Sequence, residues 1–192
     1  MKNVGIILAA GRGKRMHSVV QKQYLLLQGK PVLYYSLKAF QECPFIDEII
    51  LVTGEDEISY CQEEIVRKFN LDKVKQIVPG GKERYHSVYE GLKAAGDCHL
   101  VFIHDGARPF VDQGILERTK EEAETYQACV AGMPVKDTIK LSDGHGTAVE
   151  TPRRDLLWMI QTPQVFDCAL IREAYRKLME SDGTLAVTDD AM

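Results

Sequence analysis

Apolar positions along this chain gather into short runs separated by amphipathic segments. Five runs rich in Val and Ile have the length and composition of buried β-strands. They are residues 4–10, 48–53, 76–78, 100–104 and 129–135. Because these runs are apolar on successive positions, each predicts a strand covered on both faces, as in a parallel sheet.

The segments between the runs carry apolar residues at helical spacing. Residues 56–69 place four apolar side chains on one stripe, and residues 83–96 form a second stripe that ends before Gly96, a predicted C-terminal cap. Helices are also predicted over residues 29–42, 113–127 and 168–181. Strands that alternate with helices predict an α/β fold, a Rossmann-like and mostly parallel sheet flanked by helices.

Residues 136–155 break this alternation. The turn at residues 143–146, Asp-Gly-His-Gly, lies between two short β-prone runs and predicts a β-hairpin. The segment is weakly apolar and interrupts an α/β pattern. We therefore expect an arm that projects from the domain.

Length and composition favour one soluble domain over residues 1–192. A chain of 192 residues can bury about 70% of its surface in a single core. Hydrophobic residues make up 45% and charged residues 27%, and no run approaches the roughly 18 apolar residues of a membrane span. The net charge of -4 argues against a broad nucleic-acid surface but leaves room for a local basic pocket. We expect neither a membrane nor a nucleic-acid partner.

The five cysteines are spread widely and include no CxxC pair. Their number is odd and their spacing fits neither a disulfide framework nor a zinc site. We expect reduced thiols and a cytoplasmic location.

A glycine loop follows the first predicted strand. Gly11 and Gly13 allow backbone N–H groups to approach an anion, and Arg15 adds positive charge. The loop lacks the third glycine of a dinucleotide fingerprint, where Met16 stands, and the GK[ST] ending of a Walker loop. A densely anionic group such as a triphosphate fits it best, and Lys22 is a second cation nearby in sequence.

Two further segments are expected at the same edge of the sheet. Asp105 ends an apolar strand, and one such carboxylate together with substrate phosphates can hold Mg²⁺. Gly80 and Gly81 form a second glycine pair before a predicted helix, where Ser87 can hydrogen-bond a base. In isolation, each of these residues also fits an ordinary turn or helix surface.

Together these motifs resemble one family. LAAGRGKRM, KQY, GGKERYHSV, HDGARPF, VKDTIK, TPRRDLLWMIQTPQVF and TDDA occur in the order and approximate spacing of the 2-C-methyl-D-erythritol 4-phosphate cytidylyltransferases of the non-mevalonate isoprenoid pathway. The resemblance runs from Val4 to the last residue. It implies a nucleotidyltransferase-type domain that uses CTP, a polyol phosphate and Mg²⁺ or another divalent cation, and releases pyrophosphate.

The resemblance also implies roles for individual residues. The nucleotide-binding set is Ala9, Ala10, Gly11, Gly13, Gly81 and Ser87. The catalytic cations at the α-phosphate are Arg15 and Lys22. Residues that line the polyol phosphate pocket are Asp105, Arg108, Thr138, Arg154, Thr162 and Thr188, and Asp105 is also the metal ligand.

In the family, the arm hooks onto a second subunit and presents an arginine to its site, so the resemblance implies a homodimer. Three positions depart from the family pattern: Gln21 replaces a usual proline, Lys82 a common acidic residue, and Arg153 an aspartate of some members. The family continues beyond the end of this sequence, and we expect that the C-terminal end of the family domain is missing here.

Two alternatives stay open at this point. A ribitol-5-phosphate cytidylyltransferase would share the glycine loop and the fold, although the arm favours methylerythritol phosphate. A non-catalytic nucleotide-binding module would bind CTP without releasing pyrophosphate. A nicotinamide oxidoreductase is disfavoured by the missing third glycine.

Overall fold

A six-stranded sheet forms the centre of the computed structural model, which describes residues 2–11, 20–181, 187 and 189–192. The strands are β1 (Val4–Leu8), β4 (Glu48–Thr53), β5 (Val74–Pro79), β6 (Leu100–Asp105), β7 (Ala128–Pro134) and β10 (Trp158–Asp167). Their order across the sheet is β5-β4-β1-β6-β10-β7. Strand β1 pairs in parallel with β4 and β6, and β4 pairs in parallel with β5. The predicted, mostly parallel sheet is confirmed.

Strand β10 is the strand of the main sheet that the apolar pattern did not predict. It runs antiparallel to both β6 and β7. Its sequence carries Thr162, Pro163 and Gln164 in the middle, and the register with β7 shifts between Ile160 and Gln164. A proline cannot donate to the sheet ladder, and the irregularity interrupts the two-residue period by which strands are found.

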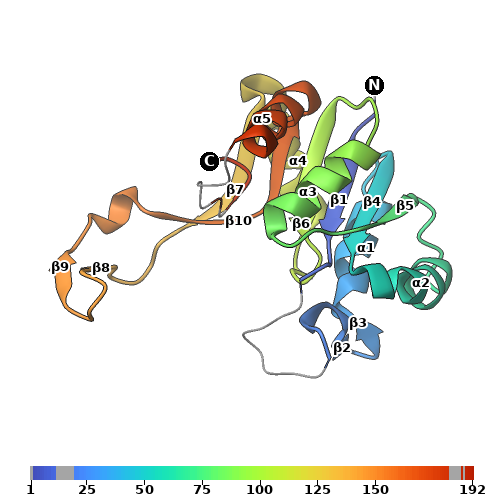
Figure 1. The fold of residues 1–192 in the computed structure, drawn as a ribbon, viewed down its shortest axis with the longest axis horizontal. Coiled ribbons are helices and arrows are strands. Elements are labelled where there is room, and N and C mark those ends of the chain that lie inside the picture. The colour runs from blue at the N-terminus through green and yellow to red at the C-terminus, as the bar shows by residue number, and fades with distance from the viewer. Residues whose placement is uncertain (1, 12–19, 182–186, 188) are drawn as a thin grey trace.

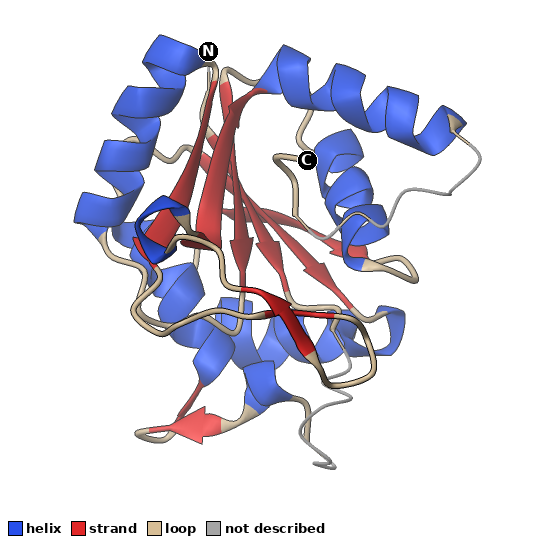
Figure 2. Cartoon of the chain, turned by 90° about the vertical axis from the view of Figure 1, so that its left-hand side faces the viewer, coloured by secondary structure: helices blue, strands red, loops and turns tan. Residues whose placement is uncertain are grey.

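Helices cover both faces of the sheet (Figure 2). Helices α1 (Val32–Glu42) and α4 (Gln113–Tyr126) share one buried cluster with the helical segment that contains Ile65, whereas α3 (Arg84–Ala94) and α5 (Cys168–Glu180) share the other. Neighbouring strand residues divide between the two clusters: Ile7 lies in the first and Ile6 in the second. The continuous apolar runs of the sequence therefore supply both cores.

The predicted helices are present, with small differences in their ends. Gly96 follows the end of α3 at φ 58°, as expected of a C-terminal cap. Residues 56–69 are mostly helical but change their hydrogen-bond spacing, through the 3-10 turn η2 (Glu55–Glu57), α2 (Ile58–Tyr60) and the π-helical η3 (Cys61–Arg67). Within the described ranges, no helix has the length and apolar character needed to cross a bilayer.

Two small hairpins stand outside the main sheet. Strands β2 (Leu26–Leu27) and β3 (Lys30–Pro31) follow the 3-10 turn η1 (Lys22–Tyr24). Strands β8 (Leu141–Ser142) and β9 (Ala148–Glu150) form the predicted arm, followed by η4 (Arg154–Leu156). Figure 1 shows the β8–β9 hairpin far from the sheet, at the end of the stalk that β7 and β10 make. The predicted projecting arm is therefore present.

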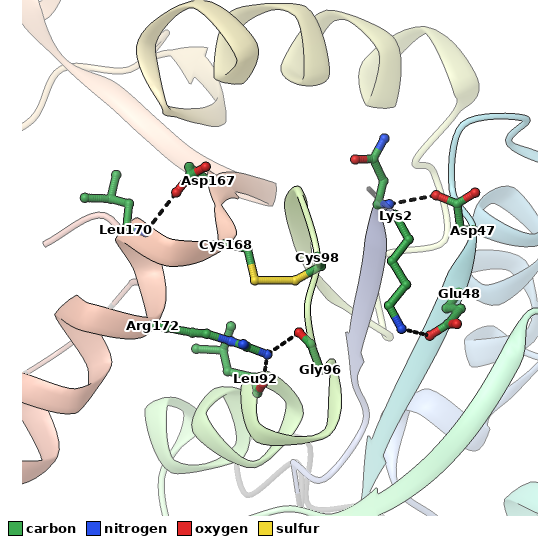
Figure 3. The surroundings of a disulfide bond; sticks show 11 residues. Lys2, Asp47, Glu48, Leu92, Gly96, Cys98, Asp167, Cys168, Leu170 and Arg172 are labelled. Atoms are coloured by element: carbon green, nitrogen blue, oxygen red, sulfur yellow. Dashed lines mark hydrogen bonds and ion pairs between the residues drawn. A yellow bond between two sulfur atoms is a disulfide. The ribbon is translucent and has the colours of Figure 1, made fainter.

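The cysteines differ from the prediction. Cys98 and Cys168 form a disulfide, with their Cα atoms 5.8 Å apart (Figure 3), so the expectation of unpaired thiols is wrong for these two. The fold creates this pair from residues separated by 70 positions, since the loop before β6 lies against the start of α5, where the Cys168 amide donates to the His99 carbonyl. Sequence spacing contains no sign of such a contact. Cys43, Cys61 and Cys129 are free.

We predict that Gly91→Ala destabilises the fold. A Cβ atom at Gly91 would lie 2.5 Å from Ile6 Cγ2 and 3.2 Å from Val52 Cγ2, so α3 would have to move off the sheet. Such overpacking costs about 1–3 kcal/mol of the free energy of unfolding, measurable by urea denaturation. Gly114→Ala in α4 is the matched control, because its nearest neighbour is the flexible end of Arg118. Equal loss in the two variants would contradict the close contact of α3 with β1.

Candidate functional site

The carboxyl ends of β1, β4 and β6 meet at one edge of the sheet, where parallel α/β folds bind their ligands. Ala9, Ala10 and Gly11 follow β1, and the turn at Gly80 and Gly81 follows β5. A Cβ atom at Gly80 would lie 2.4 Å from Ala10 Cβ and 2.8 Å from Ser87 Oγ, so this turn packs against the loop after β1. The Gly81 amide donates to Ser87 Oγ at 3.1 Å. The predicted nucleotide-binding residues Ala10, Gly81 and Ser87 therefore lie together.

Lys22 lies on a turn that is tied to the same loop. The buried Gln23 donates from Nε2 to the carbonyl of Ala9 at 2.5 Å and to that of Gly11 at 3.1 Å. The side chain of Lys22 is exposed, and no ion pair to it is present among the described residues. Gln23 therefore fixes the backbone at Lys22 relative to the glycine loop and leaves the ammonium group available.

Tyr24 and Gln21 hold the other side of this turn. The Tyr24 hydroxyl lies 2.8 Å from Thr53 Oγ1 and donates to Glu57 Oε2 at 3.0 Å, and burial raises the pKa of Tyr24. Gln21 Nε2 donates to the other carboxylate oxygen of Glu57. Gln21 has φ -64°, the value that a proline imposes, so its departure from the family pattern leaves the backbone unchanged.

Asp105 lies at the end of β6 between two guanidinium groups. Arg84 Nε donates to its Oδ1 at 3.3 Å, and Arg108 Nε donates to its Oδ2 at 2.9 Å. Burial alone would raise the pKa of Asp105, but the two arginines outweigh it and hold the pKa below its usual value. Asp105 is therefore a carboxylate at neutral pH.

Behind Asp105, His104 and Thr162 form a buried relay of hydrogen bonds. His104 Nε2 lies 3.1 Å from the Arg108 carbonyl, which can only accept, so Nε2 carries the proton. Nδ1 then accepts from Thr162 Oγ1 at 3.0 Å, and Thr162 Oγ1 accepts from the Asp105 amide at 3.2 Å. Desolvation lowers the pKa of His104 to about 4, so the ring is neutral and its tautomer is fixed.

A second carboxylate, Asp190, shares Arg84 with Asp105. Arg84 Nη1 donates to both oxygens of Asp190 at 2.8 Å, and the Tyr175 hydroxyl donates to Oδ1 at 2.6 Å. Burial raises the pKa of Asp190, while Arg84 and Tyr175 oppose that rise. No role was predicted for Arg84, His104 or Asp190, although Arg84 lies within the GGKERYHSV motif and Asp190 within TDDA.

An open pocket of about 760 Å³ lies on the side of α4 and β7, and His104, the residue before Asp105, is part of its lining. Arg108 and Thr162, both predicted to contact the polyol phosphate, line it together with Gln161, Phe110 and Met133. Arg108 Nη1 also donates to Gln161 Oε1. The structure therefore brings Asp105, Arg108 and Thr162 to one place.

The remaining predicted residues lie elsewhere. Thr138 and Arg154 are exposed on the arm, where Arg154 Nη1 donates to the Lys136 carbonyl at 2.9 Å. The arm projects to the left of the main sheet (Figure 1). Gly13, Arg15 and Thr188 lie outside the described residues. Within the described ranges, no three His, Cys, Asp or Glu side chains converge for a metal ion.

Glycine turns, a lysine and a carboxylate at the carboxyl edge of a parallel sheet define an α/β nucleotide-binding protein of the nucleotidyltransferase type. The chain belongs to the 2-C-methyl-D-erythritol 4-phosphate cytidylyltransferase family, whose model matches residues 4–192.

Relatives of the same name support this membership. The protein of Lachnospira eligens is 51% identical over 190 residues, which cover 99% of this chain and 83% of the relative. The protein of Clostridium kluyveri is 48% identical over 188 residues, which cover 98% of this chain and 80% of that protein. Among solved structures, the 4-diphosphocytidyl-2C-methyl-D-erythritol synthase of Anaerococcus prevotii matches with TM-score 0.84 and 34% identity, over 99% of this chain and 79% of that one. The chain thus spans about four fifths of these relatives.

Acid should destabilise the fold through His104. The pKa of His104 is lowered from 6.5 to about 4, so the unfolded chain binds a proton first as the pH falls. The neutral ring makes its full contribution to the free energy of unfolding above pH 6.5. As the pH falls from 6.5 to 4, this contribution is lost, by about 3 kcal/mol. Urea denaturation across this window measures the loss. His104→Gln keeps a donor for the Arg108 carbonyl and should show a shallower slope; an unchanged slope would contradict the assignment.

Proposed function

We propose that this chain transfers the cytidylyl group of CTP to 2-C-methyl-D-erythritol 4-phosphate, giving 4-diphosphocytidyl-2-C-methyl-D-erythritol and pyrophosphate. One observation carries the proposal: in a chain of this family, the glycine turns and Asp105 occupy one edge of the sheet, and the Lys22 turn is bonded to the glycine loop there. In the proposed reaction, an oxygen of the substrate phosphate attacks the α-phosphorus in line. The bond between the α-phosphorus and the bridging oxygen breaks, and pyrophosphate leaves.

The nucleotide would bind across the two glycine turns. Ala9, Ala10, Gly11 and Gly13 supply backbone close to the phosphates and ribose, while Gly81 and Ser87 face the cytosine. The small side chain of Ala10 against Gly80 supports this assignment, because a larger residue at either position would force the two turns apart.

Arg15 and Lys22 would stabilise the charge that develops on the α-phosphate. Phosphoryl transfer needs positioning and electrostatic stabilisation more than covalent chemistry from the protein. Lys22 suits this role because Gln23 and Tyr24 fix its turn, while its ammonium group keeps no carboxylate partner within the described ranges. The assignment of Arg15 rests on the family motif.

Asp105 is the residue that we propose to hold Mg²⁺ or another divalent cation. A single carboxylate fits this ion, because Mg²⁺ retains waters and takes further ligands from substrate phosphates. Asp105 is ionised and its side chain is partly exposed, as such a ligand requires. When bound, the cation would neutralise phosphate charge; Arg84 and Arg108 orient the carboxylate that receives it.

The polyol phosphate would occupy the pocket between the turn after β6, α4 and β7. Arg108 and Thr162 line that pocket, and we propose that Thr138, Arg154 and Thr188 complete it. Because the arm extends away from its own sheet, we propose that it serves the site of a second copy in a homodimer. Exposed apolar side chains on the arm and its stalk support this interface; they include Leu141, Val149, Leu156, Trp158 and Met159. We also propose a cytoplasmic location, because the reaction consumes CTP.

The direct test is release of pyrophosphate from CTP and Mg²⁺. We expect release with methylerythritol phosphate and none without an acceptor. Release with ribitol phosphate instead would assign the chain to the sibling activity. CTP binding without release under any condition would indicate a nucleotide-binding module.

Lys22→Ala should lower kcat by about 100-fold or more, as loss of one preorganised transition-state donor commonly does. Lys75→Ala, which removes an exposed lysine of β5, is the matched control and should leave kcat unchanged. Pyrophosphate release at saturating substrates measures both. An unchanged kcat in Lys22→Ala would refute the role assigned to Lys22. In the same way, an unchanged kcat in Arg15→Ala would refute the role assigned to Arg15.

Mixing two impaired variants should restore activity if the arm serves the partner. Arg154→Ala should mainly raise KM for the polyol phosphate, and Lys22→Ala should mainly lower kcat. In a mixed dimer, one site has both Lys22 and a partner arm with Arg154, so random exchange should restore about one quarter of the wild-type rate. The assay uses low polyol phosphate, where each variant alone is slow. Additive residual rates after exchange would contradict a shared site.

A further inference from the structure

Arg84 lies between the carboxylates of Asp105 and Asp190 and donates more hydrogen bonds to Asp190 than to Asp105. Its Nη1 donates to both oxygens of Asp190 at 2.8 Å, whereas only Nε reaches Asp105, at 3.3 Å. Nη2 is buried without a partner among the described residues. A guanidinium that faces one carboxylate commonly forms two parallel hydrogen bonds with it. Arg84 makes no such pair with Asp105: Nη1 is directed to Asp190, Nε reaches Asp105 only through the longer contact, and Nη2, on the same edge of the guanidinium as Nε, does not bond to it.

Asp190 is held firmly from other directions. Its side chain has no exposed surface, and the Tyr175 hydroxyl donates to Oδ1 at 2.6 Å. Its backbone amide donates to Oε1 of Gln164, a buried residue of β10. Arg84 is the first residue of α3, so its backbone is also fixed. The geometry of the Arg84 and Asp190 pair therefore follows from three packed elements, β10, α3 and α5.

The charges of this cluster balance. Arg84 and Arg108 supply two positive charges, and Asp105 and Asp190 supply two negative charges. Without the negative charge of Asp190, Asp105 would be the carboxylate that pairs with both guanidinium groups of this cluster. Arg84 would then be free to turn toward Asp105 and to donate two hydrogen bonds to it. A divalent cation would have to compete with both arginines for the Asp105 carboxylate, and would therefore bind it more weakly.

We propose that Asp190 is a positioning residue that withholds Arg84 from full pairing with Asp105, and thereby keeps the Asp105 carboxylate available to a divalent cation. This inference rests on the proposed role of Asp105 as the metal ligand. Asp190 acts through Arg84 and does not itself touch the reacting groups. The segment at residues 189–192 thus contributes to the site through one buried charge.

The test measures binding of Mn²⁺ in the presence of a non-hydrolysable CTP analogue, by electron paramagnetic resonance of the free ion. Asp190→Asn should weaken Mn²⁺ affinity about tenfold, which is within the range for loss of an outer partner of a metal ligand. The double variant Arg84→Gln with Asp190→Asn removes both charges and frees Asp105, so its affinity should return to that of the wild type or exceed it. A role confined to folding cannot produce this rescue.

Two controls separate charge from structure. Tyr175→Phe removes one hydrogen bond from Asp190 but leaves its charge, and should lower thermal stability without changing Mn²⁺ affinity. Glu63→Gln disrupts an exposed ion pair with Arg67 on η3 and should change neither quantity measurably. Circular dichroism establishes that each variant is folded.

Three outcomes would overturn the inference. The first is wild-type Mn²⁺ affinity in Asp190→Asn, and the second is a double variant that binds as weakly as the single one. If Asp190→Asn does not fold, the double variant still decides, since affinity below wild type contradicts the proposal. The third is unchanged Mn²⁺ affinity in Asp105→Asn, which would refute the metal site itself. If Asp105→Asn binds Mn²⁺ weakly and Asp190→Asn binds it as the wild type does, only the role of Asp190 is refuted.

Discussion

The pairing of β1 with both β4 and β6 is the constraint on which the rest of the structure depends. These three strands are parallel and in register, so Leu8, Val52 and Asp105 end at the same level. Ile6 and Ile7 of β1 are fully buried, one in each core, which fixes the strand from both faces. A one-residue slip would exchange the two faces. The loops that follow these strands are therefore held at one edge, where ligand-binding chemistry can gather.

Electrostatics at this edge follows from the same geometry. Asp105 is the last residue of β6, and a carboxylate in a partly buried position needs positive partners. Arg84 approaches it from α3 and Arg108 from the turn after β6, while the neutral His104 ring and Thr162 support the backbone from beneath. Four elements therefore share the task of orienting one side chain. The neutral tautomer of His104 is part of this arrangement, because a second positive charge behind Arg108 would oppose the guanidinium.

Sequence reasoning succeeded where one local signal determines the structure. Apolar runs located five of the six strands of the sheet, because strands buried on both faces are apolar at successive positions. It failed for β10, whose middle is polar, and for the Cys98–Cys168 pair, which only the tertiary fold brings together. The position of Asp105 at the end of β6 was predicted because it ends an apolar run. Asp190 was not, since nothing in TDDA distinguishes a buried acid from an exposed one; its burial depends on Arg84, 106 positions away.

The arm presents the opposite physical situation to the sheet. Its hairpin has two short strands and exposed apolar side chains, and a two-stranded ribbon of this kind is marginal by itself. Trp158 is 59% exposed and Leu156 69%, although both side chains are large and apolar. Large apolar side chains at exposed positions lower the solubility of a protein unless another surface covers them. The sheet edge is built by contacts within one chain, whereas the apolar side chains of the arm lie exposed, as the proposed contact with a second copy requires.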